Sequence, residues 1–357
     1  MRLSAVFTID AVGVAAGGAG EGARVLGDLV VNLDADLQAA LGWQGASLHV
    51  SGRADIGGQP NLLAATLQGI DNFEVPRHTG KLYEASIDQS FASGKGDLRL
   101  GLYAVDGEFD VTDAAALFLQ PTMGTSPELA STGLYGPAIF PSTALGARLN
   151  LQPRSDVYLR VAAVNALAGD PGDPQGVNLD FRGGLFVIAE SGWTGEGKVA
   201  VGAWIYTHAQ PDVRATGAPR GRRSEGAYLT LERPLYESPS HPQISGFLRL
   251  GLSDGETGPF KASGAAGLTA GRLFAGRPAS ALALGLVWGA LSSGQRANGA
   301  AAGAPHPASE TGLELTYADK LGARLQLQPD LQYIHNPAGG PAARDALILT
   351  LRAQLGF

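Results

Sequence analysis

The sequence predicts an all-β fold: a transmembrane antiparallel up-and-down β-barrel of 16 strands, with one long loop folded into the lumen. Three observations lead to this fold class. Apolar and polar residues alternate along many short segments, the pattern of strands with one apolar face. Many of these segments have the roughly 9–11 residues that a tilted strand needs to cross a bilayer. The connections alternate between tight and long, as in bacterial barrels.

The alternation is clearest at the C-terminus, where Leu349 and Leu351 share one face of a strand while Thr350 and Arg352 share the other. Similar segments recur along the whole chain, so we expect residues 1–357 to form a single barrel domain. The predicted strands are 2–10, 26–37, 45–51, 81–92, 97–105, 143–152, 156–164, 183–193, 197–207, 224–235, 242–252, 260–273, 280–290, 309–319, 322–333 and 344–357.

The predicted connections differ in length from one rim to the other. An even number of strands places both termini at the rim with the tight turns, which in bacterial barrels is the periplasmic one. The tight turns are 93–96, 152–155, 194–196 and 320–321, and the long connections are 53–80, 106–142, 165–182, 208–223, 291–308 and 334–343.

Composition excludes several classes of protein. The chain has 357 residues, no cysteine and a formal net charge of -7, which argues against a nucleic-acid partner and removes disulfides and thiol catalysis. No apolar run approaches the roughly 20 residues of a membrane-spanning helix. The N-terminal Met1-Arg2-Leu3-Ser4 does not resemble a signal peptide, so we expect a mature or truncated form whose leader has been removed.

Motifs for catalysis or metal binding are not found. No His-x-x-x-His pair, Gly-x-Ser-x-Gly elbow or P-loop occurs, so we expect no metal, no cofactor and no enzyme activity. A barrel-borne esterase with a Ser–His pair stays open as an alternative. So does a structural or adhesive surface barrel.

A soluble β-sandwich or solenoid would also show alternating strands. Sixteen similar strands are many for one sandwich, and the polar faces repeatedly hold Gly and Arg. Trp193 and Trp288 lie at strand ends on the apolar face, where tryptophans of a membrane barrel meet the lipid head groups. These features favour the transmembrane barrel.

A barrel of about 16 strands leaves an aqueous channel, so the polar faces become the wall of a pore. Arg148 and Arg160 are on neighbouring strands, with Glu84 and Asp88 two strands earlier. The charged wall positions by parity are Arg99, Arg148, Arg160, Arg249, Arg324, Arg352, Glu84, Asp88, Glu190, Glu232, Glu314 and Asp330.

The connection 106–142 is the longest and begins with three acids, Asp106, Glu108 and Asp110. Residues 113–119 are apolar and compatible with a helix capped by Asp113. Folding this loop into the lumen would bury its apolar residues and narrow the channel, with its acids opposite arginines of the wall. The alternative is an extracellular loop folded over the rim. Arginine donors and carboxylate acceptors together suit neutral polyhydroxylated solutes.

Several segments resemble the carbohydrate-selective porin family (OprB type). They are LYEASIDQSF (82–91), LRLGLYAVDGEFD (98–110), ALFL (116–119), GPAIFPST (136–143), FLRLGLSDG (247–255) and LQPDLQYIHN with Pro337 (327–337). The resemblance implies a pore for monosaccharides such as glucose in the bacterial outer membrane. It also implies a constriction formed by Asp106, Glu108 and Asp110 of the loop with Glu84, Arg148 and Arg160 of the wall.

The candidate solute path thus comprises Glu84, Asp88, Arg99, Asp106, Glu108, Asp110, Arg148, Arg160 and Arg249. A general or anion-preferring porin is the alternative within transport, because arginines are frequent on the wall. Expected partners are small neutral sugars, outer-membrane lipid and lipopolysaccharide, with a homo-oligomer possible. The basic segment with Arg214, Arg220, Arg222 and Arg223 is a candidate for lipopolysaccharide contact.

Overall fold

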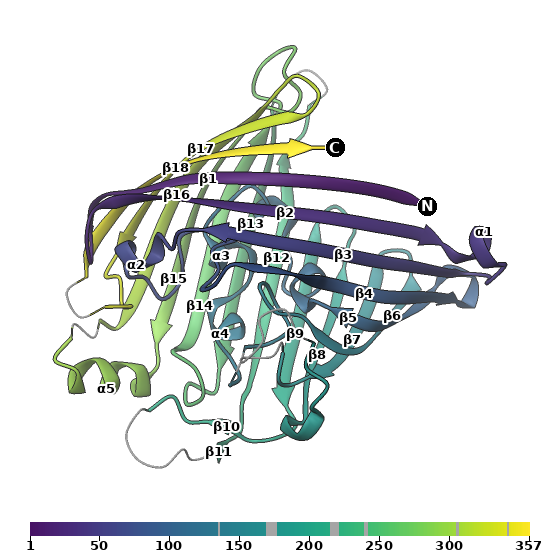
Figure 1. Cartoon of the computed structure of the whole chain (residues 1–357), viewed down its shortest axis with the longest axis horizontal. Helices are drawn as coiled ribbons and strands as arrows, with labels where there is room; N and C mark the ends of the chain where they lie inside the picture. The colour runs from purple at the N-terminus through teal and green to yellow at the C-terminus, as the bar shows by residue number, and fades with distance from the viewer. Residues whose placement is uncertain (135, 169–176, 215–220, 239–241, 305–306, 341–342) are drawn as a thin grey trace.

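The computed structural model describes residues 1–134, 136–168, 177–214, 221–238, 242–304, 307–340 and 343–357. Its strands form a closed barrel in the order β1-β18-β17-β16-β15-β14-β13-β12-β9-β8-β7-β6-β5-β4-β3-β2, and every pairing is antiparallel (Figure 1). The predicted up-and-down barrel of 16 strands is confirmed. The apolar outward faces place the strands in a bilayer, where an unpaired backbone N–H or C=O group is costly. The sheet therefore closes on itself and leaves no unpaired edge strand.

The barrel strands are β1 (Arg2–Gly18), β2 (Gly22–Asp36), β3 (Ala46–Gly57), β4 (Thr79–Phe91), β5 (Gly96–Tyr103), β6 (Ala144–Arg154), β7 (Val157–Asn165), β8 (Leu185–Trp193), β9 (Lys198–Tyr206), β12 (Glu225–Tyr236), β13 (Gln243–Ser253), β14 (Phe260–Gly271), β15 (Ala281–Leu291), β16 (Ser309–Leu321), β17 (Leu325–His335) and β18 (Arg344–Gly356). A separate short pair joins β10 (Gln210–Pro211) to β11 (Gly221–Arg222).

The barrel closes where the first strand meets the last. Val6 of β1 pairs with Gly356 of β18, so both ends of the chain lie at one rim, here called the terminal rim. The opposite end is the loop rim, from which residues 58–78, 104–143, 166–184 and 207–224 connect neighbouring strands.

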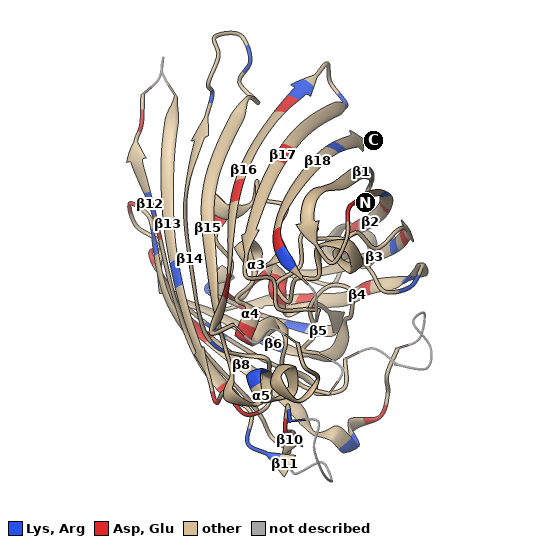
Figure 2. Cartoon of the chain, turned by 90° about the vertical axis from the view of Figure 1, so that its left-hand side faces the viewer, with Lys and Arg blue, Asp and Glu red and all other residues tan. Residues whose placement is uncertain are grey.

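Helices are few and short. They are α1 (Leu37–Leu41), α2 (Asn61–Ala64), α3 (Pro121–Gly124), α4 (Pro127–Ala130) and α5 (Ser293–Ala301), with 3₁₀ turns at Ala92–Gly94, Val105–Gly107, Asp113–Ala115 and Phe181–Gly183. In the described part of the chain, no helix is both long and apolar enough to cross a bilayer. Both Figure 1 and Figure 2 place α3 and α4 inside the ring of strands.

Three strand boundaries differ from the prediction for a physical reason. β1 continues past residue 10 to Gly18, because Val12 and Val14 point inward yet are apolar, and polarity no longer alternates there. β3 continues past residue 51, because Arg53 and Asp55 extend the inward face of the strand. The turn between β16 and β17 lies at 322–324, so Arg324 is in an exposed turn, and its predicted place on the pore wall is wrong.

Connection lengths follow the predicted alternation only in part. Two connections at the loop rim, 19–21 and 254–259, are short, while the turn 272–280 at the terminal rim is longer than either. The turn before β3 contains α1, whose first N–H groups are accepted by the side chain of Asp36. Strict length alternation is therefore not required for the barrel.

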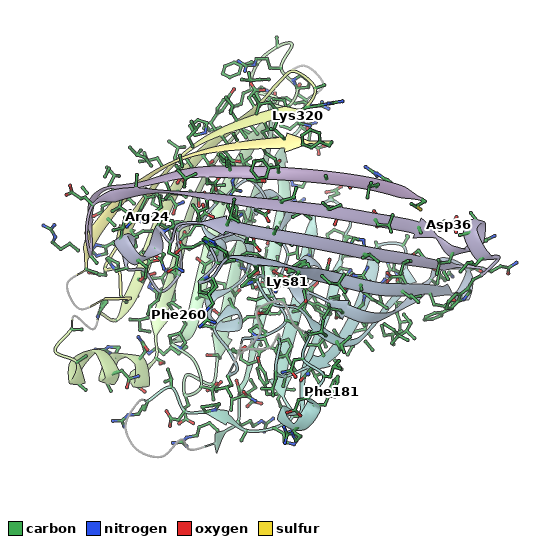
Figure 3. The ribbon with its side chains drawn as sticks, in the orientation of Figure 1. Arg24, Asp36, Lys81, Phe181, Phe260 and Lys320 are labelled. Atoms are coloured by element: carbon green, nitrogen blue, oxygen red, sulfur yellow. The ribbon has the colours of Figure 1, made fainter. Side chains whose placement is uncertain are left out.

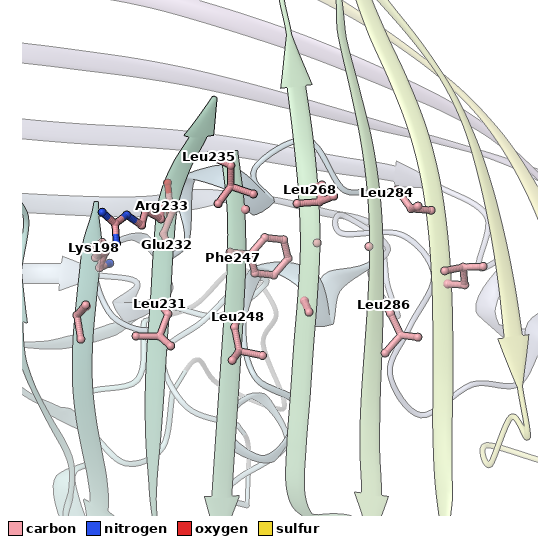
Figure 4. A pocket seen from close by; sticks show the side chains of 16 residues that line it. Lys198, Leu231, Glu232, Arg233, Leu235, Phe247, Leu248, Leu268, Leu284 and Leu286 are labelled. Carbon is pink, nitrogen blue, oxygen red and sulfur yellow. The ribbon is translucent and has the colours of Figure 1, made fainter. Parts of the chain in front are cut away.

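The outer face is apolar. Leu250, Leu284 and Leu349 are among many exposed leucines, and Trp193 and Trp288 are 41% and 40% exposed, as expected for lipid-facing positions. Leucines of β12 to β16 also surround an outer hollow of about 730 Å³ beside Gly246, where Leu231, Leu248 and Leu286 project from neighbouring strands (Figure 4). Exposed leucines in such numbers are stable only against hydrocarbon.

Candidate pore constriction

The segment 104–143, here called the long loop, enters the barrel with its described residues. Inward-facing side chains hold its backbone: the Glu314 carboxylate accepts from the N–H groups of Leu119 (2.5 Å) and Gln120 (3.1 Å). On the opposite wall, Lys198 Nζ donates to the carbonyl of Val111 at 2.7 Å. Further donors are Thr269 Oγ1 to Ala114 O (2.6 Å) and Gln328 Nε2 to Leu117 O (2.6 Å). The loop therefore crosses the lumen between β9 and β17.

The apolar side of the long loop packs on one half of the wall. Phe118 and Met123 contact Phe247 and Val287, which face inward from β13 and β15. Gly285 makes room for them, because a Cβ there would lie 2.7 Å from Phe118 Cζ and 2.8 Å from Met123 Cε. Burial of these side chains supplies the stabilisation that keeps the loop inside.

The predicted helix at 113–119 is wrong. Only a 3₁₀ turn at Asp113–Ala115 forms, its N-cap is Thr112, and no side chain caps it. Glu314 takes the N–H groups of Leu119 and Gln120, which a continuing helix would use internally. Wall contacts therefore override local helix propensity here.

A second loop, residues 58–78, also enters the lumen and was not predicted to do so. Glu310 of β16 accepts from the N–H groups of Leu67 (3.0 Å) and Gln68 (2.9 Å), and Gln332 of β17 donates to Ile70 O at 2.9 Å. Ile70 and Phe73 are buried against inward residues of β1 and β18. The apolar residues within 62–75 were the sequence signal for this placement.

Four of the predicted site residues form one ion-pair cluster at the start of the long loop. Arg148, only 4% exposed, pairs with Glu108 at 2.8 Å and with Asp88 at 3.1 Å, and also bonds Asp97. Arg99 pairs with Asp88 at 2.9 Å and with Glu108 at 3.5 Å. The cluster ties the long loop to β4, β5 and β6.

Three further predicted residues are anchors of the same kind. Arg160 donates to the carbonyl of Glu108, and its guanidinium lies 5.7 Å from the Phe109 ring centroid. Asp110 and Arg249 are almost fully buried, with Arg249 Nε 3.6 Å from Asp110 Oδ1. Arg249 also donates to Gly124 O at 2.9 Å. These side chains are engaged with the loop backbone.

Glu84 and Asp106, by contrast, line an open cavity. Glu84 Oε1 accepts from Ala104 N at 2.9 Å, and Asp106 Oδ2 accepts from Phe140 N at 3.1 Å. Burial raises the pKa of Asp106 to about 6, against the opposing effect of the Phe140 hydrogen bond.

Three cavities lie in the part of the lumen that the loops leave open, and each is bordered by wall or loop residues of the predicted site. The terminal-side cavity, about 500 Å³, includes Arg2, His49, Asp88 and Arg99 among its lining residues. The central cavity, about 400 Å³, adjoins it where His49 Nε2 lies 3.4 Å from Glu84 Oε2. The loop-side cavity, about 450 Å³, shares Asn72, Asp106 and Phe140 with the central one and reaches Phe260 at the start of β14.

Two arginines dominate the central cavity. The Arg53 guanidinium lies 4.0 Å from the Phe140 ring centroid, and Arg53 Nε is 2.9 Å from Asp28 Oδ1. The Arg352 guanidinium lies 4.9 Å from the Phe73 ring centroid and pairs with Asp10 at 2.7 Å. Stacking and ion pairing hold each guanidinium plane in place.

Arg352 is among the predicted wall residues, whereas Arg53, Asp28, Asn72, Phe73 and Phe140 of this cavity are not among the predicted site residues. Arg53 lies in the predicted connection 53–80, although it continues the inward face of His49 and Ser51. Phe73 and Phe140 come from loops, where no periodicity signals their position.

Charged positions gather around α3, α4 and β4 to β6 in Figure 2. Lys81 of β4 is a further charged residue in this region, and its Nζ donates to the carbonyl of Pro141 in the long loop (Figure 3). Among the described residues, no group of three or more His, Asp and Glu side chains is placed to hold a metal ion.

A closed barrel with a leucine-rich outer face and charged cavities through its interior defines a porin, a transport channel rather than an enzyme. The chain belongs to the carbohydrate-selective porin family, OprB, whose profile matches residues 20–357. Its relatives are outer-membrane proteins, and it therefore belongs in the bacterial outer membrane. No curated protein matches the sequence.

Solved structures share the fold. The high-pH structure of Pseudomonas putida OprB aligns with a TM-score of 0.88 at 17% identity, covering 100% of this chain and 94% of that one. The channel DcaP of Acinetobacter baumannii aligns with a TM-score of 0.61 at 10% identity, covering 100% and 96%. An anion-selective porin from Comamonas acidovorans aligns with a TM-score of 0.60 at 15% identity, covering 100% and 99%.

Proposed function

We propose that this porin lets small neutral sugars, monosaccharides such as glucose, diffuse passively through the three cavities, with the long loop narrowing the path. The central cavity is the selective section. The observation that carries the proposal is the pair Arg53 and Arg352, stacked on aromatic rings in a cavity of about 400 Å³ that also holds Asp28, Glu84 and Asp106.

This arrangement matches the chemistry of a sugar. Hydroxyl groups both donate and accept, so guanidinium donors and carboxylate acceptors in one cavity replace the water around a pyranose. The donors are held rigid by ion pairs and stacking, which limits the entropy lost on contact. Binding stays weak because each guanidinium already has partners, and weak binding permits exit.

An anion-preferring pore fits this cavity less well. Arg53 is within 3.2 Å of both Asp28 and Asp55, and Arg352 is within 4.0 Å of both Asp10 and Asp71. The arginine charges are therefore compensated locally, and an anion entering the cavity meets no positive charge that lacks a carboxylate partner.

Other contacts follow from the same assignment. We propose that residues 1–357 form one domain, since β1 and β18 pair, and that the outer leucines contact lipid. Lipopolysaccharide would contact the loop rim, where Arg214, Arg222 and Arg223 lie, whereas Arg220 is outside the described residues. Association with further copies of the chain stays possible on the outer face.

Liposome swelling tests the proposal directly. Purified protein in liposomes should admit glucose faster than di- and trisaccharides, and faster than amino acids of similar size. Arg53→Gln should change the glucose rate severalfold, whereas Arg182→Gln, at an exposed loop arginine, should not. Equal rates for glucose and a charged amino acid of the same size would contradict sugar preference.

A further inference from the structure

The three cavities differ sharply in charge. The terminal-side cavity is lined by Arg2, Asp34, Asp36, Asp88 and Arg99, together with His49 and the Met1 residue. The central cavity holds three carboxylates and two guanidiniums, from Asp28, Glu84, Asp106, Arg53 and Arg352. The loop-side cavity has only Asp106 and Asp113 as ionisable lining residues. Charged lining residues are therefore fewest in the loop-side cavity.

The lining of the loop-side cavity is mostly apolar. It includes Val111, Ala116, Ala130, Ile139 and Phe260, and apart from Asp106 and Asp113 its polar groups are neutral side chains such as Gln68 and Thr125. Its volume of about 450 Å³ falls within the roughly 300–1,000 Å³ of sites that bind small organic ligands. An apolar lining with a few polar groups is also typical of such sites.

The cavity is continuous with the sugar path. Asn72, Asp106 and Phe140 line both the loop-side and the central cavity. Phe140 shows how the two regions divide: the Arg53 guanidinium covers its ring on the central side, 4.0 Å from the centroid, and the same residue borders the apolar lining beyond. A solute seated at this junction faces charged groups at one end and apolar groups at the other.

We infer that the loop-side cavity is a subsite for an apolar aglycone, and that glycosides with an aryl or alkyl substituent bind with the sugar ring in the central cavity. This inference rests on the proposed sugar path and names a substrate class for it. A plain monosaccharide leaves the apolar lining in contact with water. An aryl group at the anomeric oxygen removes that lining from water and strengthens binding.

The test uses the protein in planar bilayers, purified in a detergent without a sugar head group, because an alkyl glycoside would occupy the subsite. Conductance is titrated with glucose, methyl β-D-glucoside and phenyl β-D-glucoside. The concentration that gives half of the maximal decrease in conductance should be about fivefold to tenfold lower for the phenyl compound than for the methyl compound. This ratio corresponds to roughly 50 Å² of apolar surface removed from water.

Ala116→Asp places a charge on an exposed position of the apolar lining and should bring the phenyl-to-methyl ratio close to one. Ala301→Asp, at an exposed position of α5, is the matched control and should keep the wild-type ratio. The wild-type comparison of the two glucosides stands even if a variant fails to fold.

The possible outcomes separate the two ideas. If glucose and both glucosides reduce conductance at the same concentration, the aglycone subsite is overturned and the sugar path stands. If the phenyl advantage persists in Ala116→Asp, the aryl group binds elsewhere and the subsite assignment is overturned. If no sugar permeates or reduces conductance, the proposed sugar path fails, and the subsite fails with it.

Discussion

The guanidinium of Arg53 on β3 lies 4.0 Å from the centroid of the Phe140 ring, which stands near the end of the long loop. This contact joins the barrel wall to the loop at the boundary between two cavities of the proposed solute path. Asp28 Oδ1 lies 2.9 Å from Nε of the same side chain. The position of one side chain thus depends on two strands and one loop together.

Arg53→Ala should lower the affinity for glucose severalfold and shift the pore toward cations. The change removes a fixed array of donors and leaves the carboxylates of Asp28 and Asp55 without their partner. Glucose titration of the conductance and reversal potentials in a KCl gradient measure the two effects. Arg182→Ala is the control, and an unchanged reversal potential in Arg53→Ala would rule out Arg53 as a path residue.

Arg148→Ala should act mainly on stability. Arg148 is nearly buried and pairs with Asp88, Asp97 and Glu108, so its loss leaves carboxylates unpaired in the wall. Removing one partner of a buried ion pair costs about 3–5 kcal/mol. The temperature at which the barrel unfolds in detergent, read from gel mobility, should fall clearly. Arg154→Ala, at an exposed arginine that ends β6, should leave it unchanged.

Ion selectivity should depend on pH through Asp106. Its pKa is raised to about 6 by burial, so the Asp106 side chain loses its negative charge as the pH falls from 7.5 to 4.5. Reversal potentials should shift toward anion preference over this range. Asp106→Asn should make this shift smaller. Asp180→Asn should not, because hydrogen bonds from Arg182 lower the pKa of Asp180 to about 2.

The same pKa sets the sign of a stability effect. The folded chain binds the Asp106 proton more tightly than the unfolded chain, whose aspartate has its ordinary value of 3.8. The contribution of this group to stability therefore falls as the pH rises between about 4 and 6. Asp106→Asn should consequently make the barrel no less stable at pH 8, and a clear loss of stability there would contradict the assignment.

Gly285→Val should reduce the single-channel conductance. A side chain at this position meets Phe118 and Met123, and would push the long loop off β15 toward the open cavities. Overpacking of this kind costs typically 1–3 kcal/mol, so the barrel should still fold. Gly271→Val is the matched control on the neighbouring strand, since nothing lies within 4 Å of its added atom. Equal conductance in both variants would argue against a constricting loop.

The barrel could be predicted from the sequence because alternation is a local property. Leu349 and Thr350 reveal their faces without knowledge of any partner strand, and sixteen such segments determine the architecture. Boundaries failed where inward residues are themselves apolar, as at Val12 and Val14, because these pack against a loop rather than facing water.

The site was less predictable because loops build much of it. Glu84 and Asp106 line the open cavity, but Arg148 and Arg249 are engaged in holding the long loop, a difference that depends on the route of the loop. The alternation along β3 does indicate that Arg53 faces inward, because it follows His49 and Ser51 on the inner face. Phe140 gives no such sign, because loop residues have no period.

The meeting of the first and last strands has a bearing on assembly. Thr8 of β1 and both Arg352 and Gln354 of β18 border the central cavity, so its wall spans the seam of the barrel. A chain whose final strand has not yet paired with β1 lacks the Arg352 guanidinium of this cavity. Closure of the cylinder and completion of the cavity wall are thus a single event.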